Sequence, residues 1–131
     1  GRHLIVSLWR CFSPPPQDWP LALCAGHSVR DDEGTPNLMV RVETLPEGEA
    51  AFAPLENKAQ YPAASVFTFN PEHRWFMYPD MNRDEAIILT FYDSARGPNW
   101  RVPHTAFQDA RVSSGAPRQS IELRSIAYWA V

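Results

Sequence analysis

The alternation of hydrophobic and polar positions along the chain predicts a protein built mostly from short β-strands. Short runs rich in apolar, β-branched and aromatic residues recur along the sequence, and clusters of turn residues separate them. This pattern is typical of strands rather than of amphipathic helices. The most apolar run is residues 86–92. The predicted strands are residues 3–9, 21–24, 38–44, 65–69, 73–78, 86–92, 101–107 and 120–129.

The spacing of proline and glycine predicts how these strands are connected. The chain has 13 prolines, and proline interrupts helices and central strands. Residues 30–37 and 45–64 are predicted loops, and the second is long enough to suggest a functional or mobile segment. At the turn over residues 79–85, Asn82 and Glu85 resemble a capping box. The fold class that follows is all-β, a sandwich or jelly roll with long Pro-rich loops and little helix.

Composition narrows the class of protein further. The hydrophobic fraction of 44% and the length of 131 residues suffice for one domain over residues 1–131. The net charge of −3 gives no basic surface for nucleic acid or an anionic membrane. No apolar run approaches the roughly 20 residues of a membrane span, and no signal-peptide pattern is found, so we expect a cytoplasmic protein. Cys11 and Cys24 are expected to be buried free thiols.

The last third of the chain holds a spacing that can carry chemistry. His104 lies on a predicted strand, and Arg118 follows fourteen residues later at the start of the final strand. A non-haem iron site uses histidine and carboxylate ligands. The planar guanidinium of Arg118 can bind a carboxylate through two hydrogen bonds. Ser120 points to the same side of the strand as Arg118 and can add a hydrogen bond. This interpretation requires the final two strands to lie side by side; the alternative is that both residues are structural.

Several sequence blocks resemble the oxidoreductases related to gibberellin desaturase and to the cephamycin methoxylation protein. Their order along the chain and their aromatic residues make the likeness specific. The blocks are residues 8–10, 18–24, 70–75, 79–81 with 84–86, 91–94, 103–107 and 117–124.

The resemblance implies a double-stranded β-helix, or jelly roll, that uses Fe(II) and 2-oxoglutarate. It implies that His104 is the distal iron ligand and that Arg118 and Ser120 bind 2-oxoglutarate. The family's first ligand pair, His-x-Asp, is expected upstream of Leu8-Trp9-Arg10, but none of the four histidines has Asp or Glu two residues later. The remaining three histidines are His3, His27 and His73, of which His3 could replace a missing ligand.

Two functions are therefore expected of this chain. The first is the C-terminal part of an oxygenase domain that hydroxylates or desaturates a small secondary metabolite in its complete parent. We expect the isolated chain to be inactive, because the upstream ligands are missing. The alternative is a non-catalytic β-module, an accessory subunit or a remnant, whose unpaired strand edges favour a homodimer or a partner chain.

Overall fold

The computed structural model describes residues 1–54, 60–112 and 117–130, and its regular secondary structure is almost entirely β-strand. The elements in chain order are β1 (His3–Cys11), β2 (Leu21–Cys24), η1 (Gly26–Ser28), β3 (Thr35–Val40), η2 (Gly48–Phe52), β4 (Gln60–Val66), β5 (Trp75–Met77), β6 (Ile87–Asp93), β7 (His104–Ala106) and β8 (Ser120–Tyr128). The two η elements are short 3₁₀ helices. The prediction of a mainly β fold with little helix is confirmed.

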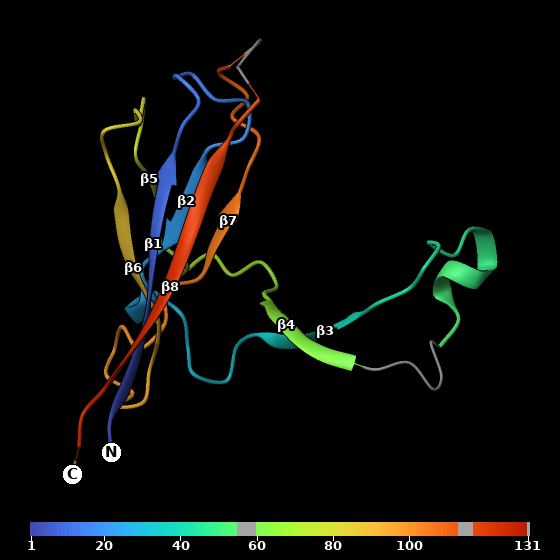
Figure 1. The fold of residues 1–131 in the computed structure, drawn as a ribbon, viewed down its shortest axis with the longest axis horizontal. Helices are drawn as coiled ribbons and strands as arrows, with labels where there is room; N and C mark the ends of the chain where they lie inside the picture. Colours follow the sequence, from blue (N-terminus) through green and yellow to red (C-terminus); the bar gives the residue numbers. More distant parts are fainter. Residues whose placement is uncertain (55–59, 113–116, 131) are drawn as a thin grey trace. The chain divides into compact units, whose positions relative to one another are not determined.

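The chain divides into two compact units, and the first contains residues 1–30 and 70–131. This unit holds two antiparallel three-stranded sheets, with strand orders β6-β1-β8 and β5-β2-β7 (Figure 1). Successive strands of the unit alternate between the two sheets, from β1 to β2 and from β5 through β8. This alternation is the winding of a jelly roll.

A small hydrophobic core joins the two sheets of the first unit. Trp9 and Cys11 of β1 pack with Leu21 of β2, and Met81 from the β5–β6 connection completes the cluster. Leu23 and Ile87 pack against this cluster from β2 and β6. Trp9 and Cys11 therefore mark the inner face of their sheet, and the residues that alternate with them along β1 point to its outer face.

The two cysteines are free and only 1% exposed, as the sequence predicts. The thiol of Cys11 lies 3.4 Å from the carbonyl oxygen of Gln119, to which it donates. The thiol of Cys24 contacts the Ser28 hydroxyl at 3.5 Å. Both thiols thus serve as small packing groups with weak hydrogen bonds.

The second unit, residues 31–69, contains the two-stranded sheet β3-β4 and the short helix η2. Here the predicted boundaries are wrong. The strand expected at residues 38–44 is β3, which begins at Thr35, and the strand expected at 65–69 is β4, which begins at Gln60. Pairing of Thr35 with Val66 fixes these bounds, and a two-stranded sheet has only edge strands, which tolerate the prolines that suggested loops. Residues 55–59 of the predicted 45–64 loop lie outside the described residues.

Candidate functional site

His104 is the first residue of β7 and pairs with Leu23 of β2. Directly paired residues of antiparallel strands point to the same face of the sheet. Because Leu23 packs against the core, His104 also faces the space between the two sheets. Its ring centroid lies 6.1 Å from that of Phe91, a residue of β6 in the opposite sheet.

The imidazole of His104 is held in one tautomer by the backbone. Its Nδ1 donates to the carbonyl oxygen of Val102 at 2.9 Å. The other ring nitrogen, Nε2, therefore carries a lone pair. Metal-binding histidines commonly use this arrangement, in which one nitrogen donates to a carbonyl and the other binds the metal. The half-buried ring is thus suited to be a metal ligand.

Arg118 is fixed at its backbone, while its guanidinium keeps free donors. The backbone N–H donates to Oδ1 of Asp18 at 2.9 Å, and Nη1 donates to Oγ of Ser120 at 3.1 Å. The guanidinium carbon lies 5.4 Å from the centre of the Trp9 ring. Among the residues that the structure describes, the buried Nε of Arg118 has no hydrogen-bond partner. A buried donor without a partner is costly, and a bound carboxylate would satisfy it.

Ser120 stands beside Arg118 on the core-facing side of β8. It pairs with Cys11, which belongs to the core, so its side chain lies on the inner face of the sheet. Its oxygen accepts the bond from Arg118, and its hydroxyl proton is left to donate to another group. Arg118 and Ser120 together can therefore offer several donors to one anion.

Glu122 and Arg124 continue this inner row along β8. Arg124 Nε donates to Oε1 of Glu122 at 2.9 Å, and the Ser7 hydroxyl donates to the same oxygen. The bond from Ser7, and then the bond from Arg124, lower the pKa of Glu122, against an opposing effect of burial. The Arg124 guanidinium lies 4.0 Å from the centre of the Phe91 ring. Phe91 thus contacts both His104 and Arg124.

The prediction that the final two strands lie side by side is wrong. β7 pairs with β2, and β8 pairs with β1, so the two strands belong to different sheets. Because the chain alternates between sheets, consecutive strands face one another across the interior instead of sharing hydrogen bonds. His104 and Ser120 still point toward the same interior, from opposite sides.

The charged side chains of this unit form local ion pairs. Arg124 binds Glu122 at 2.9 Å. Asp93 binds Arg2 at 2.6 Å, and Asp109 binds Arg111 at 2.6 Å. Among the described residues, no group of three or more His, Cys, Asp or Glu side chains is placed to hold a metal ion.

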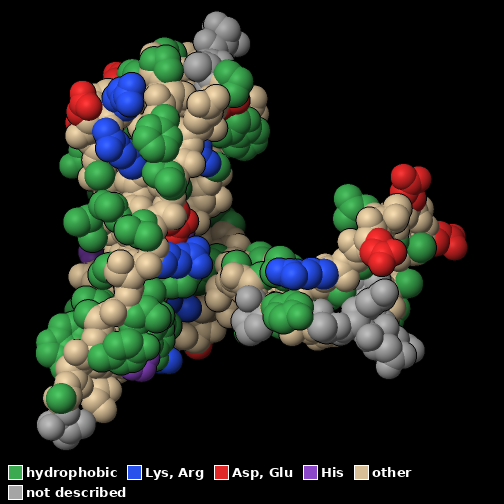
Figure 2. Space-filling model, viewed as in Figure 1, with side chains coloured by type: hydrophobic (Ala, Val, Ile, Leu, Met, Phe, Trp, Pro, Cys, Tyr) green, Lys and Arg blue, Asp and Glu red, His purple; other side chains and the backbone are tan. Residues whose placement is uncertain are grey.

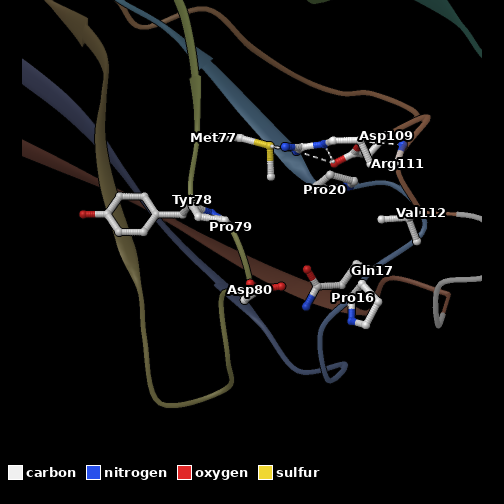
Figure 3. A pocket seen from close by; sticks show the side chains of 10 residues that line it. All are labelled: Pro16, Gln17, Pro20, Met77, Tyr78, Pro79, Asp80, Asp109, Arg111 and Val112. Carbon is white, nitrogen blue, oxygen red and sulfur yellow. Dashed lines mark hydrogen bonds and ion pairs between the residues drawn. The ribbon is translucent and has the colours of Figure 1, made fainter.

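A pocket of about 250 Å³ is lined by neither His104 nor Arg118, and the sequence did not indicate it. It lies among the β1–β2 connection, the end of β5 and the segment after β7 (Figure 3). Gln17 closes one side, with Nε2 donating to the carbonyls of Ser13 and Met81 at 3.1 and 3.0 Å. Asp109 and Arg111 form the opposite wall, and hydrogen bonds from Arg111 lower the pKa of Asp109 to about 2.

Comparison with known proteins identifies the relatives of this chain. Residues 1–128 match the family described as "Oxidoreductase/YMDC permease-like domain". The chain belongs to this family. Among its relatives, the hydroxylase/desaturase CTB9 of Cercospora beticola is 33% identical over 98% of this chain and 37% of its own length. The hydroxylase/desaturase asaB of Aspergillus flavus is 32% identical over 98% of this chain and 56% of its own length.

A solved structure connects this oxidoreductase family with the predicted fold. The iron and alpha-ketoglutarate-dependent endoperoxidase NvfI superposes with a TM-score of 0.76 and 28% identity, over 99% of this chain and 42% of that one. The prediction of a jelly-roll fold and of kinship with iron/2-oxoglutarate oxygenases is therefore confirmed. The chain spans about two-fifths to just over half of the length of these relatives. No helix among the described residues is long and apolar enough to cross a membrane.

Proposed function

We propose that this chain is the part of an Fe(II)/2-oxoglutarate oxygenase that supplies one iron-binding histidine and the side chains that bind the cosubstrate. The observation that carries the proposal is the position of His104 and Ser120 on facing strands, with both side chains directed to one interior. The name of the relative nvfI, an Fe(II)/2-oxoglutarate-dependent dioxygenase of Aspergillus novofumigatus, supports it; this protein is 29% identical over 98% of the chain.

Different residues of the chain fit Fe(II) and 2-oxoglutarate. The Nε2 lone pair of His104, fixed by the Val102 carbonyl, would bind Fe(II). Arg118 and Ser120 would bind the far carboxylate of 2-oxoglutarate, whose charge would satisfy the buried Nε of Arg118. When bound, the iron and its cosubstrate supply the oxidation of an unactivated carbon by O₂. The protein's part is to orient the cosubstrate and to hold the imidazole in one tautomer.

The remaining iron ligands are proposed to come from outside this chain. The described residues bring no carboxylate and second histidine together near His104, and a complete site needs two histidines and one carboxylate. In the whole protein we propose hydroxylation or desaturation of a small secondary metabolite, as a member of the oxidoreductases related to gibberellin desaturase and to the cephamycin methoxylation protein. A non-catalytic accessory module is the second candidate, and the lack of a three-ligand group among the described residues favours it.

Thermal stability measured with Mn(II) and 2-oxoglutarate distinguishes the two candidates. If the proposal is right, 2-oxoglutarate raises the melting temperature, and Mn(II) raises it further. His104→Ala should abolish only the effect of Mn(II), and Arg118→Ala should abolish the effect of 2-oxoglutarate. His27→Ala and Arg83→Ala are matched controls at exposed positions and should behave like the unmodified chain. A melting temperature that neither addition changes would leave the accessory module as the better account.

A further inference from the structure

The backbone at Arg118 lies just outside the ladder that joins β8 to β1. The ladder ends where Ser120, the first residue of β8, pairs with Cys11, the last residue of β1. Residues 14–16 of the chain beyond β1 are prolines, and proline has no N–H to donate to a neighbouring strand. Strand pairing alone therefore does not fix the residue that carries the guanidinium.

Side chains of the β1–β2 connection bond this part of the backbone instead. Oδ1 of Asp18 accepts from the N–H of Arg118 at 2.9 Å, and Oγ of Ser13 accepts from the N–H of Gln119 at 3.2 Å. The N–H of Phe12 donates to the carbonyl oxygen of Gln119 at 2.7 Å. The connection and the beginning of β8 lie at the same end of the first unit (Figure 1). Three hydrogen bonds thus hold the two residues that precede β8.

The connection that carries Asp18 is itself held by buried groups. Gln17 is 7% exposed, and its Nε2 donates to the carbonyl oxygens of Ser13 and Met81 at 3.1 and 3.0 Å. Met81 belongs to the hydrophobic core. Moving a buried amide away from such partners is costly, because its donors would be left unsatisfied. The position of Asp18 is therefore tied to the core, and the backbone of Arg118 is tied to Asp18.

The bond to Asp18 fixes Arg118 without neutralising its charge. The carboxylate accepts from the backbone N–H, and no salt bridge among the described residues includes Arg118. The guanidinium lies 5.4 Å from the centre of the Trp9 ring and donates to Ser120. Acidic and basic side chains both lie among hydrophobic ones at the end of the unit seen at the top of Figure 2, so charge alone does not select an anion there. The fixed position of the Arg118 guanidinium can.

We propose that Asp18 is a positioning residue, which holds Arg118 at the separation from His104 that fits 2-oxoglutarate and not a longer 2-oxo diacid. This inference rests on the proposed function, in which His104 binds iron and Arg118 binds the far carboxylate of the cosubstrate. A ligand held at both ends is selected by the separation of its two anchors, and an anchor that can move selects less sharply. Arg118 thus provides the charge, and Asp18 provides the selectivity for length.

Hydrogen exchange of the Arg118 amide tests the bond to Asp18 without any ligand. Asp18→Ala should speed this exchange by about tenfold, because the amide loses a hydrogen bond to a charged group. Asp18→Asn should restore protection, because its side-chain oxygen can accept the same bond. Asn99→Ala is the matched control, since Oδ1 of Asn99 also accepts from a distant backbone N–H, that of His27 at 3.0 Å. Exchange at Arg118 that Asp18→Ala leaves unchanged would overturn the inference.

Calorimetric titration with 2-oxoglutarate and with the longer 2-oxoadipate, both in the presence of Mn(II), tests the selectivity. Asp18→Ala should lower the affinity for 2-oxoglutarate by about tenfold and the affinity for 2-oxoadipate by less, so that the preference narrows. Asp18→Asn should recover the preference. Asn99→Ala should keep it even where the melting temperature falls, which separates positioning from lost stability. Affinities for both acids that fall by the same factor in Asp18→Ala would contradict a positioning role.

The same titration separates this inference from the proposed function. If the unmodified chain binds 2-oxoglutarate and Arg118→Ala abolishes binding, while Asp18→Ala changes neither affinity nor preference, the proposed function stands and the role of Asp18 is wrong. If the unmodified chain binds neither acid, the proposed function fails and the role of Asp18 fails with it.

Discussion

Arg118 donates from Nη1 to Oγ of Ser120 at 3.1 Å, and this contact places a guanidinium and a hydroxyl at one point on the inner side of the sheet. The two side chains are separated by one residue at the start of β8. Their combined donors suit a carboxylate better than either group alone, because a guanidinium can form two parallel bonds while the hydroxyl adds a third.

Removing either donor should weaken binding of 2-oxoglutarate by different amounts. Arg118→Ala should lower the affinity about tenfold or more, because hydrogen bonds to charged groups contribute about 1.5–3 kcal/mol. Ser120→Ala should lower it only about threefold to tenfold, since a neutral donor contributes about 0.5–1.5 kcal/mol. Titration followed by NMR chemical shifts measures both, with Arg83→Ala as the control. If neither substitution changes the affinity for 2-oxoglutarate, the two residues do not bind it.

The core should depend strongly on one of the tryptophans. Trp9 is 7% exposed and belongs to the cluster that joins the two sheets, whereas Trp19 is 47% exposed. Trp9→Ala should lower the free energy of unfolding by about 3–5 kcal/mol through lost burial and an unfilled cavity. Trp19→Ala should cost about 1 kcal/mol or less. Urea denaturation compares them; similar losses for the two variants would contradict the core described.

The ion pair of Asp109 and Arg111 should make stability depend on pH. Hydrogen bonds from Arg111 lower the pKa of the Asp109 carboxyl from 3.8 to about 2. A lowered pKa in the folded state stabilises the protein above the unfolded value, and this contribution disappears as the pH falls from about 4 to about 2. The stability difference between the unmodified chain and Asp109→Asn should therefore shrink over that range. Thermal unfolding at several pH values measures it, with Glu49→Gln as a control that should show no such trend.

The isolated chain should not turn over 2-oxoglutarate. His104 is the single ligand that we assign here, and one histidine cannot supply the two-histidine, one-carboxylate set of this class of enzyme. The assay measures succinate released in the presence of Fe(II), O₂ and 2-oxoglutarate. Succinate above a no-protein control, and lost in His104→Ala, would show that the chain completes an iron site by itself.

The sequence predicted the strands of the first unit because their signals are local. Residues 21–24 were predicted at their observed bounds, and residues 120–129 differ from β8 by one residue. The first run begins directly after Pro20, and the second begins directly after the polar Gln119. In the second unit the hydrophobic alternation was misleading, because Pro36 lies inside β3 and only the pairing with β4 reveals that strand.

The arrangement around the candidate site could be predicted only in part. The motif around His104 and Arg118 identified the residues, but not that β7 and β8 belong to different sheets. Pairing partners far apart in sequence decide this, and hydrophobic periodicity does not record them. The contacts of Phe91 with both His104 and Arg124 depend on the same long-range pairing. The Asp109–Arg111 pair, by contrast, has a short spacing that could have been recognised as a local ion pair.

We propose Nε2 of His104 as the metal-binding atom of this chain. Addition of Mn(II) with 2-oxoglutarate, followed by NMR of the histidine ring protons, tests this assignment, because the paramagnetic ion broadens the signals of its own ligand. The His104 ring signals should broaden first, those of His27 should stay sharp, and Arg118→Ala should reduce the effect of 2-oxoglutarate. Ring signals that broaden equally at both histidines, or a His104 signal that stays sharp, would show that His104 is not the ligand.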